Sequence, residues 1–312
     1  MVSEAPVRTP CPAKDLRIAL AAKADAIFSS YDDHPQLMTM SDINLEKYFE
    51  KIGFTGPAPA TLGTLKRLQA LHTTAIPFEN IDPLMGRPVS LDLSALSEKF
   101  LDQGRGGYCY EQNIFFQGVL KSLGFSVSGL AAVVQWDKPA ECGPRVHMVL
   151  RVELPEGEFI VDVGFGRLTL TSPLELVPTI EQKTTLEDFR LMPINGEFQV
   201  QCKLGGRWAA LYKVSLQTVS LDDYAVYNWF TSTNPESVFT NHLMVARPTD
   251  KLRYGMFDNH LSIHYPTGQT EKRKIQSSEE LSAVLKENFL IRLPEGCGPT
   301  LERLIQSNEK AI

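Results

Sequence analysis

The sequence predicts an α+β protein of more than one domain, with a helical N-terminal part, a β-rich middle and a smaller α/β part. Apolar residues recur with helical spacing up to residue 124 and with the two-residue spacing of strands from residue 126. The chain has 312 residues, which is more than one hydrophobic core usually organises. We expect an extension over 1–40, a helical bundle over 41–125, a β domain over 126–223, and a connecting helix with an α/β piece over 224–312.

Helices are expected throughout the first part. The first begins at Ser41 as N-cap and ends at Gly53, because the apolar residues between them follow i, i+3, i+4, i+7 spacing. The others are expected over 64–72, around 93–100, and from the glycine-rich segment 104–107 to Gly124.

Short runs that alternate apolar and polar residues predict strands in the rest of the chain. Between two of these runs, Gly205-Gly206 is typical of a tight hairpin turn. Ser277 and Glu280 have the spacing of a capping box, so a helix is expected to begin there. The expected strands cover 126–136, 145–153, 158–163, 198–204, 208–214, 242–247, 253–257 and 261–265, and a helix over 224–230 connects the two groups.

Composition argues against several classes of partner. Lys and Arg number 31 against 37 Asp and Glu, so the net charge of −6 gives no reason to expect nucleic acid. No apolar run approaches the roughly 18 residues that a membrane-spanning helix needs. Because residues 1–40 also lack the apolar region of a secretory signal, we expect a cytoplasmic protein without membrane partners.

The five cysteines are scattered and odd in number, and none forms a CxxC pair. This pattern favours neither a zinc site nor a disulfide framework, so no metal is expected. Most of these thiols are interpreted as buried or incidental.

Cys109 is the exception, because it follows a glycine pair in the segment Arg105-Gly106-Gly107-Tyr108-Cys109 and opens the fourth predicted helix. The free N–H groups and positive dipole end of a helix start favour a thiolate and can receive an oxyanion. A third glycine is missing, so the segment is not a dinucleotide-binding fingerprint. A lone cysteine at a helix start is more often structural, so the interpretation depends on a base.

His147 and Asp162 are the candidate partners, since they lie in consecutive predicted strands. If Glu153 pairs with Glu158, Asp162 falls opposite Val149 and shares a sheet face with His147, about 7–8 Å away. A loop shorter by one residue would turn Asp162 to the other face. The spacing permits the pair without requiring it, and a core histidine with its own partner remains the alternative.

These segments resemble the arylamine N-acetyltransferases from about Ser41 to Pro294. The resemblance implies a helical bundle, a β-barrel and an α/β lid around a papain-like Cys109-His147-Asp162 core. The 38 residues from cysteine to histidine and 15 from histidine to aspartate match the family order. The resemblance rests on residues 77–80, 105–109, 146–148, 161–166 and 233–240.

The resemblance further implies a ping-pong reaction. Cys109 takes an acyl group from acetyl-CoA, or from malonyl-CoA as some fungal relatives do, and passes it to an arylamine or hydrazine. His147 manages protons, and Asp162 orients the imidazole.

By position, Phe78 and Phe165 correspond to acceptor-pocket aromatics, and Tyr108, Gly143 and Gly166 to contacts with CoA or the acyl group. Ordinary core packing explains Phe165 nearly as well, and a tight turn explains Gly166 equally well.

Two departures from the family and two other functions stay open. Many members have tryptophan or phenylalanine at the position of Tyr108, and residues 142–145 also differ. Arg145 or Arg167 could meet a malonyl carboxylate, although solvated surface arginines are the default interpretation. A thiol hydrolase or transglutaminase-like enzyme would use the same triad, and an inactive binding module would need none of it.

Overall fold

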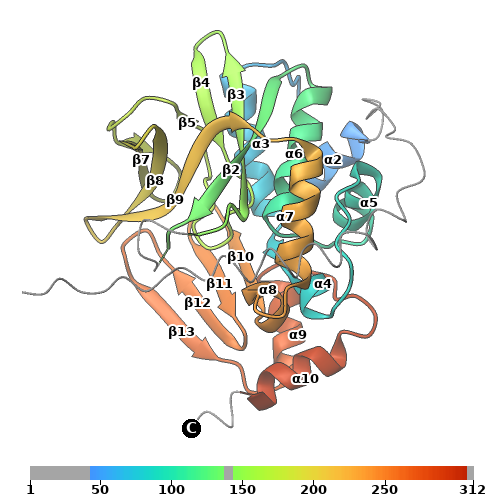
Figure 1. Ribbon diagram of the computed structural model, residues 1–312. Coiled ribbons are helices and arrows are strands. Elements are labelled where there is room, and N and C mark those ends of the chain that lie inside the picture. Colours follow the sequence, from blue (N-terminus) through green and yellow to red (C-terminus); the bar gives the residue numbers. More distant parts are fainter. Residues whose placement is uncertain (1–42, 137–142, 308–312) are drawn as a thin grey trace, which may run out of the picture. The chain divides into compact units, whose positions relative to one another are not determined.

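The helical part begins with a short amphipathic helix capped at both ends. The computed structural model describes residues 43–136 and 143–307, all within one compact unit, Met40–Ile312 (Figure 1). Helix α2 (Leu45–Ile52) starts at Asn44, whose side chain accepts the Lys47 N–H, and ends at Gly53 with φ 69°. The predicted stop is confirmed. The predicted N-cap is wrong, since Ser41 lies outside the described residues and the Asn44 carboxamide satisfies the free N–H instead.

Helix α6 (Cys109–Ser122) is the buried centre of this part and packs on strands β2 and β3. Its Phe115 and Phe116 side chains are fully buried, which contributes about 1.5–3 kcal/mol for each ring. The expected helix over 64–72 is α3, and the one over 93–100 is α5 followed by a π-helical turn. The remaining elements of this part are α3 (Leu62–Ala75), β1 (Phe78–Glu79), α4 (Ile81–Leu84), α5 (Leu93–Ser97) and η1 (Glu98–Asp102).

The middle of the chain forms an eight-stranded antiparallel sheet in the order β5-β4-β3-β2-β9-β8-β7-β6. It is a nearly closed barrel, because the Gln182 amide of β6 exchanges two hydrogen bonds of 2.8 Å with the Glu175 backbone of β5. The strands are β2 (Ser126–Val134), β3 (His147–Leu154), β4 (Gly157–Val161), β5 (Leu174–Glu175), β6 (Gln182–Lys183), β7 (Asp188–Ile194), β8 (Glu197–Leu204) and β9 (Arg207–Thr218).

The register of β3 and β4 is the predicted one, with Glu153 opposite Glu158. Two carboxylates face each other there, and Arg151 offsets their repulsion at 3.2 Å and 4.0 Å. Strand β7 was not expected, although Asn195-Gly196, both with positive φ, forms the tight turn before β8. An Asn-Gly pair is the strongest short hairpin signal, so the sequence did contain evidence for this strand.

A second sheet of five strands, β1-β10-β11-β12-β13, lies below the barrel in Figure 1. Its first strand comes from the helical part of the chain, because Phe78 pairs with Ala246. Strand β13 and helix α10 were not predicted. The elements are α7 (Leu221–Thr233), α8 (Val238–Asn241), β10 (Met244–Pro248), β11 (Arg253–Phe257), β12 (His260–His264), β13 (Thr270–Lys274), α9 (Ser278–Glu287) and α10 (Gly298–Ser307).

Only one of the two hydrogen bonds of the predicted capping box at α9 forms. The Ser277 hydroxyl accepts the Glu280 N–H at 3.2 Å, whereas the Glu280 carboxylate accepts from the Gln276 N–H. Among the helices of the described residues, none combines the length and apolar character that crossing a bilayer requires.

Candidate active site

Cys109 is the first residue of α6 and the end of a tightly packed glycine loop. A Cβ on Gly106 would lie 1.9 Å from the Pro77 carbonyl oxygen, and one on Gly107 would lie 2.6 Å from the Glu111 carboxylate. Only glycine fits either position, which explains the pair before the cysteine. The Cys109 Sγ is 3.7 Å from the Val146 carbonyl oxygen, so the thiol lies next to the start of β3.

A buried network of charges fixes this loop. Arg105 Nε donates to Glu79 Oε1 at 2.8 Å, and Lys99 Nζ is 2.5 Å from Glu111 Oε1. The other oxygen of Glu111 accepts the Tyr108 N–H at 3.0 Å, directly before the cysteine. Burial raises the pKa of Glu111 to about 7 although Lys99 lowers it. The network therefore couples the start of α6 to the neighbouring loops.

His147 and Asp162 form a buried hydrogen-bonded pair. The imidazole Nε2 is 2.7 Å from Asp162 Oδ2, and the two side chains are 3% and 0% exposed. His147 opens β3, and Asp162 directly follows β4, so the confirmed strand register brings them together. The other ring nitrogen, Nδ1, is left for Cys109, which reverses the Ser-His-Asp arrangement in which Nε2 faces the nucleophile and Nδ1 the acid.

The Asp162 carboxylate is held from α6, the helix that begins with Cys109. Asn113, one turn after Cys109, donates to Asp162 Oδ1 at 3.1 Å and to the Met148 carbonyl at 2.9 Å. The Gly164 N–H donates to the same carboxylate oxygen at 2.8 Å. A Cβ on Gly164 would lie 2.7 Å from Cys109 Cα, so this glycine permits the close approach of the strand end to the helix.

Each side chain shifts the pKa of the other in the direction that favours an ion pair. Burial alone would lower the pKa of His147, but the Asp162 carboxylate and hydrogen bonds to Asp162 and Cys109 outweigh it and raise the pKa to about 10. Burial would raise the pKa of Asp162, but His147, Gly164 and Asn113 lower it below its usual value. The raised pKa of His147 and the lowered pKa of Asp162 favour an imidazolium beside the Cys109 thiol at neutral pH.

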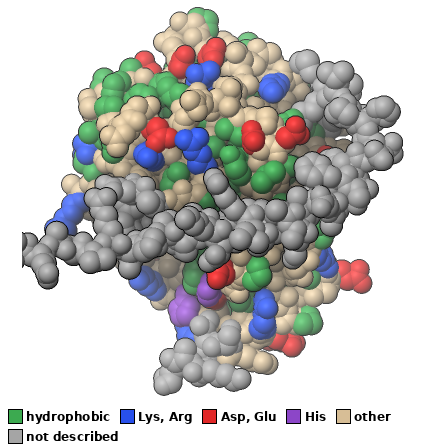
Figure 2. All heavy atoms as spheres, viewed as in Figure 1, with side chains coloured by type: hydrophobic (Ala, Val, Ile, Leu, Met, Phe, Trp, Pro, Cys, Tyr) green, Lys and Arg blue, Asp and Glu red, His purple; other side chains and the backbone are tan. Residues whose placement is uncertain are grey.

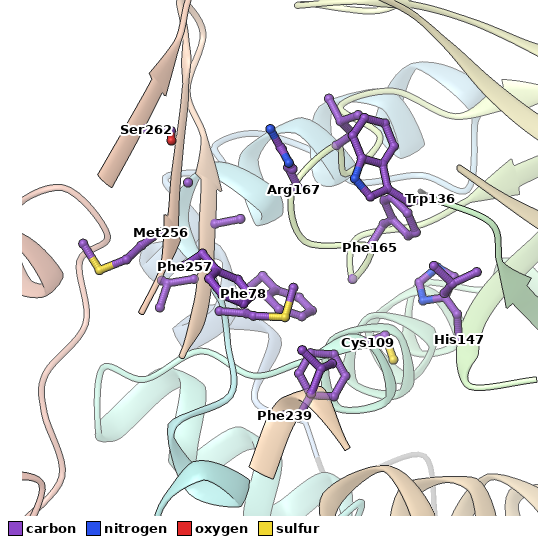
Figure 3. Close-up of a pocket in the computed structure, with 18 of the residues that line it drawn as sticks. Phe78, Cys109, Trp136, His147, Phe165, Arg167, Phe239, Met256, Phe257 and Ser262 are labelled. Carbon is purple, nitrogen blue, oxygen red and sulfur yellow. The ribbon is translucent and has the colours of Figure 1, made fainter. Parts of the chain in front are cut away.

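Cys109 and His147 lie side by side at one end of a cavity of about 680 Å³ (Figure 3). Phe78, Phe165 and Phe239 surround them. Within residues 43–136 and 143–307, no cluster of three or more His, Cys, Asp or Glu is arranged to hold a metal ion.

A sequence model of the N-acetyltransferase family matches residues 61–296. Arylamine N-acetyltransferases from Escherichia coli and Mycolicibacterium smegmatis are 36% and 37% identical to the chain. The matches cover 78% and 82% of this chain and 88% and 94% of those relatives. The Mycobacterium marinum arylamine N-acetyltransferase, also solved in complex with CoA, has a TM-score of 0.81 and 38% identity over 85% of this chain and 99% of that one.

The chain belongs to the arylamine N-acetyltransferase family. It is therefore an acyltransferase, and the family reaction is the transfer of an acetyl group to an arylamine.

The other residues predicted from the family resemblance fall into two groups. Phe78 and Phe165 line the cavity. Tyr108 and Gly143 do not line the cavity. Tyr108 is fully buried and its hydroxyl donates to Asn228, whereas Gly143 is exposed. Gly166 lies behind Phe78, because a Cβ there would be 3.3 Å from the ring.

The cysteines follow the expectation where the structure describes them. Cys109, Cys202 and Cys297 are free thiols. Cys11 and Cys142 lie outside the described residues.

The far end of the cavity is cationic, because Arg167 and Lys272 line it. Sequence reasoning missed Phe239, although it lies in the family segment 233–240, and it missed most of the polar end. Figure 2 shows histidine side chains near Lys or Arg on the face that carries the five-stranded sheet. The polar residues that line the cavity there are Arg167, His260, Ser262, His264 and Lys272.

A row of small residues connects the two ends. Phe78, Ala246, Gly255, Ser262 and Lys272 are direct partners across the five strands, so their side chains share one sheet face. Four strand spacings of roughly 4.8 Å place Lys272 about 19 Å from Phe78. The row forms the floor of a channel that runs from the aromatic end to the cationic end.

Proposed function

We propose that this protein is a CoA-dependent N-acyltransferase that moves an acetyl or malonyl group to an arylamine or hydrazine through an acyl intermediate on Cys109. The observation that carries the proposal is the buried His147–Asp162 pair beside a cysteine at a helix start, open to one cavity. This arrangement supplies a nucleophile, a proton carrier and an orienting acid in papain-like geometry.

In the first half-reaction, the Cys109 thiolate attacks the thioester carbonyl. The negative charge moves to the carbonyl oxygen, where first-turn N–H groups of α6 have no helical acceptor and can stabilise it. The carbon–sulfur bond to CoA then breaks, and the CoA thiolate takes the proton of the His147 imidazolium. The products are free CoA, neutral His147 and an acyl thioester on Cys109.

In the second half-reaction, the amine nitrogen attacks the acyl-cysteine carbonyl. Neutral His147 accepts the proton that the nitrogen loses, and the carbon–sulfur bond to Cys109 breaks. The amide leaves, and the thiolate–imidazolium pair is restored. Asp162 stays ionised throughout and holds the imidazole in place, since its pKa is lowered.

The channel fits a long donor with an anionic end. The reacting thioester would lie at Cys109, the flexible arm would follow Ala246, Gly255 and Ser262, and the phosphates would meet the cationic end at Lys272. The acceptor ring would occupy the aromatic end between Phe78, Phe165 and Phe239. That the M. marinum relative binds CoA supports this assignment.

The two candidate arginines differ in their access to a malonyl carboxylate. Arg145 is 3.3 Å from Glu197 and does not line the cavity, whereas Arg167 lines it and lies 5.3 Å from the Trp136 ring centroid. Arg167 is therefore the guanidinium that a malonyl donor could reach. We further propose that residues 41–125 supply Cys109, that the barrel domain over 126–223 supplies His147 and Asp162, and that the lid spans 224–312.

The proposal is tested by intact mass spectrometry after separate incubation with acetyl-CoA and malonyl-CoA. We expect an acyl adduct on Cys109 from at least one donor, absent in Cys109→Ser. No adduct from either donor would contradict the transferase, and an adduct that survives Cys109→Ser would contradict the site.

Amine dependence separates the transferase from a thiol hydrolase. The acyl-enzyme should persist without an amine and disappear when an arylamine such as 4-aminobenzoate is added, with the amide as product. Rapid loss of the adduct in buffer alone would favour the hydrolase.

A further inference from the structure

One buried ion pair joins the two walls of the channel. Arg253 Nε and Nη2 donate to Glu187 Oε1 and Oε2 at 2.7 Å and 2.6 Å, so the contact is bidentate. Arg253 opens β11 in the five-stranded sheet, and Glu187 directly precedes β7 in the barrel. The side chains are only 3% and 15% exposed. The contact therefore links one sheet to the other in a place that solvent screens weakly.

The pair lies next to the cationic end of the channel. Arg253 is the direct strand partner of His264, which lines the cavity. Arg253 lies two residues before Gly255 on β11, so it is on the same sheet face as the row that contains Gly255, Ser262 and Lys272. Arg253 itself does not line the cavity, and the mechanism above uses neither it nor Glu187.

The Glu187 side of the contact is anchored as well. The Glu187 carbonyl accepts the Thr184 hydroxyl at 2.7 Å and the Thr184 N–H at 3.2 Å. The Thr171 hydroxyl donates to Thr184 at 3.1 Å, which ties this turn to the next loop of the barrel. The carboxylate is thus presented from a closed turn, and the planar guanidinium fork fixes both its distance and its angle.

We propose that Arg253 and Glu187 form a clamp that sets the spacing of the channel walls and so positions acyl-CoA. The inference rests on the proposed function, because it assumes that the donor lies in this channel. The two residues are positioning residues: they touch neither the donor nor the reacting atoms. Loss of the clamp should weaken binding of a donor that fills the channel and spare a donor that reaches only Cys109.

Three variants separate a clamp from simple charge attraction. Glu187→Gln removes a negative charge, Arg253→Lys keeps the charge but loses the fork, and Arg253→Gln removes a positive charge. A clamp predicts that all three raise KM for acetyl-CoA, by about tenfold for the loss of one well-oriented contact. Attraction of phosphates by charge alone predicts a lower KM for Glu187→Gln, no change for Arg253→Lys and a higher KM for Arg253→Gln.

p-Nitrophenyl acetate is the matched short donor, because it carries an acetyl group without the CoA arm. Its kcat/KM should stay within about twofold of wild type in each folded variant. The controls are the same charge changes at the exposed pair Lys203–Glu181, whose side chains are 2.8 Å apart on the barrel surface. They should leave the kinetic constants for both donors unchanged.

The outcomes distinguish the two proposals. If wild type acylates Cys109 with neither donor, the proposed function fails. If wild type is active and Glu187→Gln lowers KM for acetyl-CoA, the clamp is wrong and the proposed function stands. The same conclusion follows if the variants reduce kcat/KM equally for acetyl-CoA and for p-nitrophenyl acetate. The conservative Glu187→Gln and Arg253→Lys variants suffice for the decision if Arg253→Gln does not fold.

Discussion

Two buried histidines of this protein have pKa values that are shifted in opposite directions. His72 in α3 contacts the Tyr48 hydroxyl at 3.1 Å and Gln112 Oε1 at 2.8 Å, and burial lowers its pKa to about 4 although the hydrogen bond to Gln112 raises it. At His147 the cost of burial is outweighed by Asp162 at 2.7 Å, and the pKa rises to about 10. Burial by itself disfavours an imidazolium, and a carboxylate partner reverses that preference.

Consecutive residues of α6 serve the two sites. Gln112 offers a neutral amide to His72, and Asn113 supports the carboxylate that faces His147. Helix α6 thus contacts a histidine with a lowered pKa in the helical core and supports the partner of one with a raised pKa at the barrel. The difference between an inert and a reactive histidine is therefore the charge of the partner and not the depth of burial.

The largest effect is expected from Asp162→Asn, which makes the partner of His147 neutral, like that of His72. The pKa of His147 should then fall because burial is no longer opposed, and the imidazolium should be lost. We expect the rate of Cys109 acylation by acetyl-CoA to drop on the order of 10⁴-fold. Time-resolved intact mass spectrometry measures this rate, and acylation at more than a tenth of the wild-type rate would contradict the role of Asp162.

The second effect is on stability at acidic pH. His72 binds a proton more weakly in the folded protein, so its contribution is present above pH 6.5 and is lost as the pH falls through about 4. The shift corresponds to about 3 kcal/mol of unfolding free energy. Urea unfolding of His72→Gln between pH 4 and 7 should show a flatter dependence than wild type.

His147 should act in the opposite direction on the alkaline side. Its raised pKa contributes stability that is complete below pH 6.5 and is lost as the pH rises through about 10. Asp162→Asn should remove this alkaline dependence and leave the acidic one. Unchanged alkaline slopes would show that the pair is not charged in the folded protein.

The third effect concerns Asn113, which supports Asp162. Asn113→Ala removes the donors to Asp162 and Met148 and the acceptor of the Val163 N–H. We expect Cys109 acylation to slow by about 10–100-fold, as for other residues that orient a catalytic group. The pH profile of acylation separates a positioning role of Asn113 from a general loss of stability. Only loss of support for Asp162 should lower the pKa of His147, and with it the pH above which the acylation rate falls. Gln117→Ala, one turn further along α6, is the matched control.

The smallest effect is expected from His72→Gln on catalysis. Because the pKa of His72 is lowered and His72 does not line the cavity, kcat/KM for acetyl-CoA should stay within about twofold of wild type. A large loss of activity in a well-folded variant would mean that the two histidine sites are coupled through α6.

Much of the site could be predicted from sequence because its elements are local. The glycine pair and helix start make Cys109 a candidate, and the two-residue period places His147 and Asp162 on consecutive strands whose register is confirmed. Helix positions were found from periodicity, while the N-cap of α2 was not, since Ser41 and Asn44 are both good caps and only the three-dimensional start decides between them.

The rest depends on contacts between distant segments. Strands β5 and β6 have only two residues each, so no period can be seen in them. Strand β1 forms only because Phe78 meets Ala246, 168 residues further on. The cationic channel end and the Arg253–Glu187 contact likewise join segments whose proximity only the assembled sheets create. Asn113 could have been suspected from its i+4 spacing to Cys109, but its partner was fixed by the fold.

The two short end strands of the barrel affect how the protein behaves among copies of itself. An open sheet edge is a template on which another chain can add a strand, and long apolar edges lead to aggregation. Here the edges of β5 and β6 are turned toward each other, and the Gln182 amide occupies the Glu175 N–H and C=O that a foreign strand would need. The other sheet ends in β13, whose residues include Lys272, Arg273 and Lys274, and like charges repel a second copy. Both sheets therefore end in ways that favour dispersed molecules at high concentration.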